Sequence, residues 1–140
     1  MIQGARLASM LPHAGAMVLL DAVVSWDAGM IRCRTRSHRD PRNPLRRGGR
    51  VSAVCGVEYG LQAAALHGAM RAGGVAQRAG YVARVREVVL GVGFLEGEGL
   101  LLVGARLERE EANGLLYSLT VSSVEGRVLV SGRASIALPP

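Results

Sequence analysis

The stretch RVSAVCGVEYGLQAAALHGAM, residues 50–70, decides the fold. It is typical of one long helix, and its apolar residues surround the helix axis, so the helix should be buried. Polar side chains in such a helix need partners or a function. At about 100° per residue, Glu58 and Gln62 share one face, while His67 lies roughly opposite Glu58. This pattern predicts that Glu58 and Gln62 belong to a site.

The segments on either side of this helix predict strands. Residues 30–37 alternate between a half-buried face and a face of arginines, which is typical of a strand paired with its neighbour. Asn113-Gly114 indicates a tight hairpin. Residues 5–11 predict a short helical turn, and residues 38–50, with two prolines, predict a loop without strand or helix. The other predicted strands cover residues 17–26, 81–90, 100–111, 117–121 and 127–138.

About six strands joined by short hairpins make an antiparallel sheet. One helix that is apolar all round can be buried only if that sheet wraps it. The sequence therefore predicts an α+β protein with the hot-dog fold, in which the sheet curves around a single central helix. A length of 140 residues and the absence of repeats or linkers predict one domain over residues 1–140.

Composition excludes several classes of protein. Cys33 and Cys55 form no metal-type cluster, so neither a metal site nor a disulfide framework is expected. The apolar run at residues 16–20 is too short for a signal peptide or a membrane span, which predicts a cytoplasmic protein. All 17 basic residues are arginine and the net charge is +6. Genome bias explains this, or attraction to an acidic partner; nucleic acid is disfavoured because few aromatic residues are present for stacking.

Two segments resemble a known family. LPHAGAMVLLDAVVSWD, residues 11–27, resembles the opening strand of beta-hydroxyacyl-acyl-carrier-protein dehydratases, and VEYGLQAAALHG, residues 57–68, resembles their central helix. Asn43-Pro44-Leu45 and the segment from Gln62 to His67 look like the divergent branch associated with aryl-polyene-type clusters. The resemblance implies a hot-dog dimer with active sites at the subunit interface. Acyl chains would arrive on the phosphopantetheine arm of an acyl carrier protein or on coenzyme A, without a further cofactor.

One feature of that family is absent here. Its catalytic histidine stands in a Gly-His-Phe-Pro loop about fourteen residues before the helix carboxylate, whereas this chain has RDPRNPLRRG in that region. Three interpretations remain open: the histidine is replaced, another residue supplies its chemistry, or catalysis has been lost.

Dehydration needs a base for the C2 proton and an acid for the leaving hydroxyl. Glu58 suits the acid or orienting role, since a carboxyl group in apolar surroundings can hold a proton near neutral pH; alternatively it is satisfied by backbone amides at the helix start. Gln62 could fix Glu58 or bond the neighbouring strand. His38, at the mouth of the loop, is the substitute base or a solvated loop histidine. Asn43 could hold a water or the substrate hydroxyl, but cannot shuttle protons.

A second set of residues is expected to bind substrate. Backbone amides at Cys55 and Gly56 are natural donors to a thioester oxygen. His13 precedes the first long strand, where the family's histidine is usually structural, and a catalytic role is the less favoured alternative. An arginine cluster beside the helix entrance suits docking of an acidic carrier or a phosphate, although an ordinary solvated loop would look the same. The arginine cluster comprises Arg42, Arg46, Arg47 and Arg50.

The sequence therefore favours a dehydratase-like protein acting on 3-hydroxyacyl thioesters in fatty-acid or polyketide-type synthesis. Two alternatives stand beside it. One is a degenerate subunit that binds acyl chains or stabilises an active dehydratase, and the other is a hot-dog thioesterase whose helix carboxylate activates water. A homodimer, or a heterodimer with another hot-dog subunit, is expected because the helix and edge strands of a lone hot dog leave apolar surface exposed.

Overall fold

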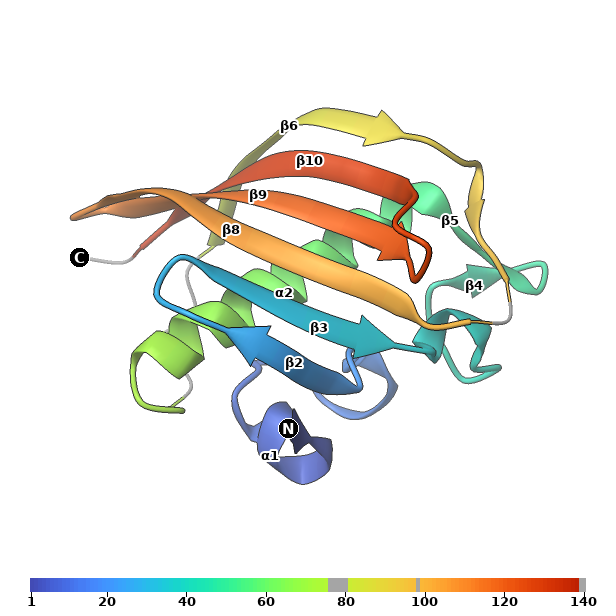
Figure 1. The fold of residues 1–140 in the computed structure, drawn as a ribbon, viewed down its shortest axis with the longest axis horizontal. Coiled ribbons are helices and arrows are strands. Elements are labelled where there is room, and N and C mark those ends of the chain that lie inside the picture. The colour runs from blue at the N-terminus through green and yellow to red at the C-terminus, as the bar shows by residue number, and fades with distance from the viewer. Residues whose placement is uncertain (76–80, 98, 139–140) are drawn as a thin grey trace.

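A seven-stranded antiparallel sheet arches over one long helix in the computed structural model (Figure 1), which describes residues 1–75, 81–97 and 99–138. The strand order is β1-β2-β3-β8-β9-β10-β6. The strands are β1 Ile2–Gln3, β2 Ala22–Trp26, β3 Met30–Thr35, β8 Leu101–Glu111, β9 Gly114–Ser123, β10 Val128–Ala137 and β6 Tyr81–Leu90. A small second sheet joins β4 Arg46–Arg47, β5 Arg50–Ser52 and β7 Phe94–Leu95.

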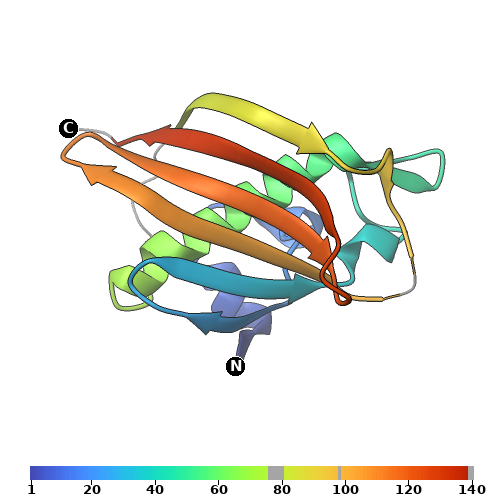
Figure 2. The ribbon, with the colours of Figure 1, turned by 45° about the horizontal axis from the view of Figure 1, so that its top comes forward.

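Helix α2, Gly56–Arg71, lies along the inner face of the sheet and packs mainly against β8 and β9 (Figure 2). Its sheet-facing residues are buried, and Gly56 and Gly60 let the helix backbone approach the side chains of the sheet closely. A Cβ on Gly60 would lie 2.8 Å from the Cβ of Leu119, and one on Gly56 would lie 2.9 Å from a methyl group of Val130. The short helix α1, Gly4–Ser9, covers another side of the core with Leu7.

Alternation along the strands separates the core from solvent. Tyr117, Leu119 and Val121 of β9 are at most 3% exposed, while the residues between them face outward. In β3, the predicted buried set of Ile31, Cys33 and Thr35 is confirmed at 0–1% exposure. The predicted hairpin after β8 is also present, with Glu111 paired to Gly114. These registers fix which side chains can reach α2.

Three predicted boundaries are wrong. The helix begins at Gly56 rather than at residue 50, because Val51 pairs with Leu95 in the small sheet. Loop 38–50 contains β4, which turns into β5 through Gly48 and Gly49, both at positive φ and therefore suited to a tight hairpin turn.

The strand predicted over residues 17–26 begins only at Ala22. Residues 17–19 form no strand, because their backbone N–H and C=O groups bond to side chains instead of to a neighbouring strand. The Leu19 amide donates to Gln62, and the Leu19 carbonyl accepts from Thr35 and Ser37. This segment is therefore fastened to the helix.

Strand β6 forms one edge of the large sheet and is exposed on both faces. Its apolar side chains Val82, Val85, Val88, Val89 and Leu90 are 38–62% exposed. A long edge strand with such side chains presents unpaired backbone groups beside apolar surface. No helix of the described residues is both long and apolar enough to cross a membrane.

The glycines of α2 give a matched stability test. Gly60→Ala should lower the free energy of unfolding by about 1 kcal/mol or more, because the new methyl group meets Leu119 and overpacks the core. Gly68→Ala should raise it by up to about 1 kcal/mol, since no atom lies within 4 Å of the added carbon and alanine favours the helix. Urea unfolding of both variants measures this, and equal effects would contradict the packing described.

Candidate active site

Gln62 joins the central helix to the segment before β2. It is fully buried, and its side-chain carbonyl accepts a hydrogen bond from the Leu19 amide at 2.9 Å. Its Nε2 donates to the Met17 carbonyl at 2.6 Å and to Glu58 Oε1 at 3.4 Å. The predicted common face of Glu58 and Gln62 is present, and the amide contacts Glu58; its other two bonds go to the segment before β2 rather than to a strand. A satisfied buried amide of this kind fixes the geometry around it.

His13 lies just before this segment, residues 17–19, and its side chain contacts the helix. His13 Nε2 lies 2.9 Å from Glu58 Oε1, and the two side chains are 26% and 31% exposed. When Nε2 donates to the carboxylate, the other ring nitrogen keeps a free lone pair; no described residue bonds His13 Nδ1. Glu58 is therefore held by a histidine and an amide rather than by backbone amides. An imidazole oriented by a carboxylate is a common acid–base unit.

The His13–Glu58 pair opens onto a groove of about 540 Å³ between α2 and the inner face of the sheet. Its helix side is lined mostly by small and apolar residues, and its far end is marked by Arg71 and Glu110, whose side chains are paired at 2.8 Å. A second hollow, on the outer face of β3, β8 and β9, has Arg32 and Arg106 as its only titratable residues. A third hollow is lined by the carboxylates Asp21 and Asp40, but among the hollows of the described residues only the first groove combines a histidine with a carboxylate in its lining.

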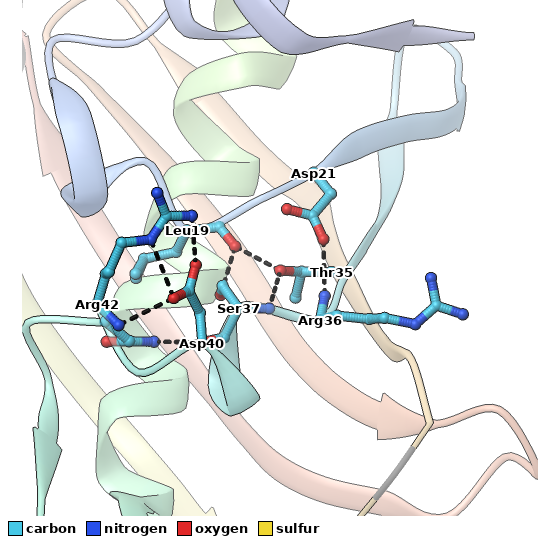
Figure 3. A network of polar contacts seen from close by, with 8 residues as sticks. Leu19, Asp21, Thr35, Arg36, Ser37, Asp40 and Arg42 are labelled. Carbon is cyan, nitrogen blue, oxygen red and sulfur yellow. Dashed lines mark hydrogen bonds and ion pairs between the residues drawn. The ribbon is translucent and has the colours of Figure 1, made fainter.

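Asn43 belongs to the loop after β3, in which Ser37 bonds Leu19 and Arg42 bonds Asp40 (Figure 3). Asn43 Nδ2 donates to the Ser37 carbonyl at 2.8 Å and to the Tyr59 hydroxyl at 3.0 Å, and its Oδ1 accepts from the Leu45 amide. Because Ser37 Oγ donates to the Leu19 carbonyl, the Tyr59 hydroxyl must donate to Ser37. The side chain of Asn43 is 6% exposed and committed to this network, and it lines a different hollow from His13.

His38 lies in the interior, 2% exposed, and does not line the groove of Glu58. Neither of its ring nitrogens has a hydrogen-bond partner among the described residues; the Gly97 backbone lies close, but without hydrogen-bonding geometry. Burial lowers the pKa of His38, and the neighbouring Gly97 backbone opposes this shift. The catalytic roles assigned to His38 and Asn43 remain predictions, and the geometry brings neither beside Glu58.

The arginine cluster makes many contacts within the chain. Arg42 pairs with Asp40, which lowers the pKa of that carboxyl, and Arg50 lies 3.5 Å above the ring of Phe94. Arg46 donates to the His38 carbonyl, and Arg47 donates to the Pro44 carbonyl. These bonds shape the loop, and docking by the cluster remains a prediction.

The predicted thioester-oxygen donors, Cys55 and Gly56, lie at the start of α2. Gly56 closes the short 3-10 turn Ala53–Cys55, and its amide already donates to the carbonyls of that turn. Gly56 also packs tightly against Val130. Cys55 is half-buried and lies outside the groove lining. Binding of substrate at Cys55 and Gly56 remains a prediction.

His67 is a partnered core group on the far face of α2, as its position predicts. Its Nε2 donates to the Asp27 carbonyl at 2.8 Å, so its Nδ1 must accept from the Tyr117 hydroxyl at 2.7 Å. Burial lowers the pKa of His67 and raises that of Tyr117 to about 12. Both groups are therefore neutral at neutral pH. Among the described residues, no cluster of His, Cys, Asp and Glu could hold a metal ion.

Sequence reasoning did not identify His13 as the partner of Glu58. The two residues are 45 positions apart, and no local pattern links them. The available signal was Leu11-Pro12-His13 before an apolar run, read as the start of a strand. The ion pair between Arg71 and Glu110 was also missed, because it joins the end of the helix to β8 across 39 positions.

Comparisons with known proteins agree with this architecture. The family model described as ApeP-like, ApeP dehydratase, matches residues 5–140. A comparison with curated proteins found no match. Among solved structures, the chain is similar to one in the dehydratase heterocomplex ApeI:P from Xenorhabdus doucetiae. The sequence identity is 22%, the TM-score is 0.83, and the match covers 96% of this chain and 91% of that one.

Two more distant structures share the fold. One is a hypothetical thioesterase with coenzyme A from Streptococcus pneumoniae TIGR4, at 9% identity and TM-score 0.63, covering 84% of each chain. The other is the PaaI protein of E. coli from the phenylacetic acid degradation operon, at 10% identity and TM-score 0.61, covering 82% of this chain and 80% of that one. The predicted hot-dog fold and the resemblance to dehydratases are confirmed.

The two buried histidines predict how stability depends on pH. The pKa values of His38 and His67 are lowered below their ordinary 6.5 in the folded protein. The unfolded chain therefore binds more protons as the pH falls through 6.5, and the free energy of unfolding should decrease between about pH 7 and about pH 5. The lowered pKa values of Asp40 and Glu110 affect stability only at lower pH.

Urea unfolding at several pH values measures this dependence. The variant His67→Gln should lose less stability than the native protein over the same interval, because one of the two titrating groups is gone. A free energy of unfolding that stays constant or rises on acidification through this interval would contradict the neutral, buried state of both histidines.

Proposed function

The chain belongs to the ApeP-like dehydratase family, and on that premise we propose that it removes water from 3-hydroxyacyl thioesters, with His13 and Glu58 as the acid–base pair. The observation that supports this role is the 2.9 Å contact between His13 Nε2 and Glu58 Oε1, two residues that line a mostly apolar groove. Acid–base groups must lie within reach of each other and of a bound substrate. The pair meets the first condition, and both of its residues line the groove in which we place the substrate.

In the proposed reaction, the proton removed from C2 is the same proton that is later given to the leaving hydroxyl. The pair takes the C2 proton, and the electrons of the C2–H bond move to the enolate oxygen of the thioester. They return to form the C2–C3 double bond as the C3–O bond breaks. The proton held by the pair passes to the leaving hydroxyl, so the products are a 2-enoyl thioester and water. Gln62 is a positioning residue, because it contacts Glu58 and holds the segment that carries His13.

In this proposal, His13 supplies the chemistry of the family histidine that the loop at residues 38–50 lacks. His13 has Glu58 as a partner and lines the groove, whereas His38 is enclosed in the core. The alternative of a thioesterase rests only on shared fold at about 10% identity.

We further propose that the thioester arrives on an acidic carrier protein or on coenzyme A. The net charge of +6 would attract either. The arginines that already bond within the loop would contribute through their remaining donors, since a guanidinium carries five N–H groups.

The exposed edge strand supports a dimer as the working unit. Strand β6 offers unpaired backbone groups and five exposed apolar side chains. Pairing with a second edge strand would satisfy those groups and cover that surface. The partner we propose is another hot-dog subunit, either a second copy of this chain or a different chain. The similar chain in the ApeI:P heterocomplex supports the second arrangement.

Substitutions at the pair test the reaction. Glu58→Gln and His13→Asn should each lower the rate of water loss from a 3-hydroxyacyl thioester by about 10²-fold or more, the usual scale for an acid–base group. Glu125→Gln, in an exposed turn, is the matched carboxylate control and should leave the rate unchanged. The rate is measured by ultraviolet absorbance of the enoyl thioester, with the protein alone and together with its hot-dog partner.

His38→Asn separates the two candidate bases. If this variant folds, it should retain turnover, because the ring lies outside the groove. A large loss with His38→Asn and little loss with His13→Asn would overturn the proposed pair. A native protein that turns over no thioester, alone or with a partner, would instead identify a non-catalytic subunit.

The edge strand is tested by oligomeric state. Val89→Lys should convert the dimer to monomer in light scattering, since Val89 is 62% exposed on β6 and a charge there opposes edge-to-edge pairing. Val24→Lys is the control, because Val24 is 44% exposed on β2 instead. Equal behaviour of the two variants would exclude β6 as the interface.

A further inference from the structure

Gly68 lies in the last turn of α2, at a position where no packing contact calls for a glycine. A helical glycine costs about 1 kcal/mol relative to alanine. Gly56 and Gly60 offset this cost by close packing against the sheet, but no atom lies within 4 Å of a Cβ built on Gly68. Its backbone does not have positive φ either. What Gly68 contributes is open space, and that space is part of the groove.

The groove follows a single stripe of the helix. Leu61, Ala65, Gly68 and Ala72 succeed one another along it at helical spacing, starting beside Glu58. Side chains of β9 and β10, including Leu115 and Ile136, form the opposite wall. Apolar side chains therefore line the groove from the acid–base pair along the helix axis. Such a lining matches an extended hydrocarbon chain.

At its far end the groove is lined by charged rather than apolar side chains. Arg71 Nη2 contacts both carboxylate oxygens of Glu110, at 2.8 and 3.0 Å. This ion pair connects the last residue of α2 with β8. A methylene group that displaced water from the pair would gain nothing, because charged groups resist desolvation. The apolar section therefore has a defined length.

We propose that Gly68 sets the length of acyl chain that this site accepts, with Arg71 and Glu110 as the end stop. The inference rests on the proposed function, because it places the thioester end of the chain at His13 and Glu58. The rise of 1.5 Å per residue puts Gly68 roughly 15 Å from Glu58 along the axis, the length of about 12 extended carbons. Ala65 lies about 4.5 Å, or roughly three to four carbons, nearer to the reacting end.

The test is a series of leucine substitutions along the stripe. Both Ala65→Leu and Gly68→Leu should shorten the longest chain that binds, and Ala65→Leu should shorten it by roughly three to four carbons more. Gly93→Leu is the matched control, because a Cβ on Gly93 also meets no atom within 4 Å and Gly93 lies outside the groove.

Binding is measured by calorimetry with saturated acyl-CoA esters of about 6, about 10 and about 14 carbons, which lack the hydroxyl that dehydration removes. In the native protein, affinity should rise by roughly three- to fourfold per added methylene until the groove is full. Gly68→Leu should weaken the longest ester by at least about tenfold and leave the shortest within about threefold.

Two results would overturn the inference. One is an equal loss of affinity for short and long esters, which would mean that Gly68 does not sense length. The other is an unchanged length profile together with a changed oligomeric state in light scattering, which would mean that a partner subunit fills the groove. If the length profile appears as expected but no 3-hydroxyacyl thioester is dehydrated, the inference stands and the proposed reaction falls.

Discussion

The buried amide of Gln62 is the interaction on which the architecture of the site depends. Its two ends bond the backbone of the segment before β2, and its Nε2 also contacts Glu58. Because an unsatisfied amide in the core would be costly, the segment cannot move away from the helix without loss of stability. That segment follows directly from His13. A single side chain thus couples the packing of the core to the meeting of the imidazole and the carboxylate.

The small residues of the central helix have different roles on its two faces. On the sheet side, Gly56 and Gly60 bring the backbone against Val130 and Leu119, which gives close packing. On the groove side, Ala65 and Gly68 leave room that the chain itself does not fill. The same residue types therefore produce a dense core on one face and a binding groove on the other.

The parts of this arrangement that depend on local periodicity were predictable from sequence. The helical spacing of Glu58 and Gln62, the buried set of β3 and the hairpin after β8 follow from patterns a few residues long. The start of α2 could not be predicted in this way. A buried apolar residue such as Val51 fits a short strand as well as it fits a helix. The pairing of His13 with Glu58 depends on how a non-strand segment is fastened to the helix, and no local periodicity encodes that contact.

The central claim is that His13 and Glu58 act as one acid–base unit. A double-mutant cycle on kcat/KM for water loss, with Glu58→Gln, His13→Asn and the combined variant, tests it most directly. Groups that act as a unit are non-additive, so the double variant should be about as slow as either single variant. If the two losses instead multiply, the residues contribute independently, and the account of a shared proton is contradicted.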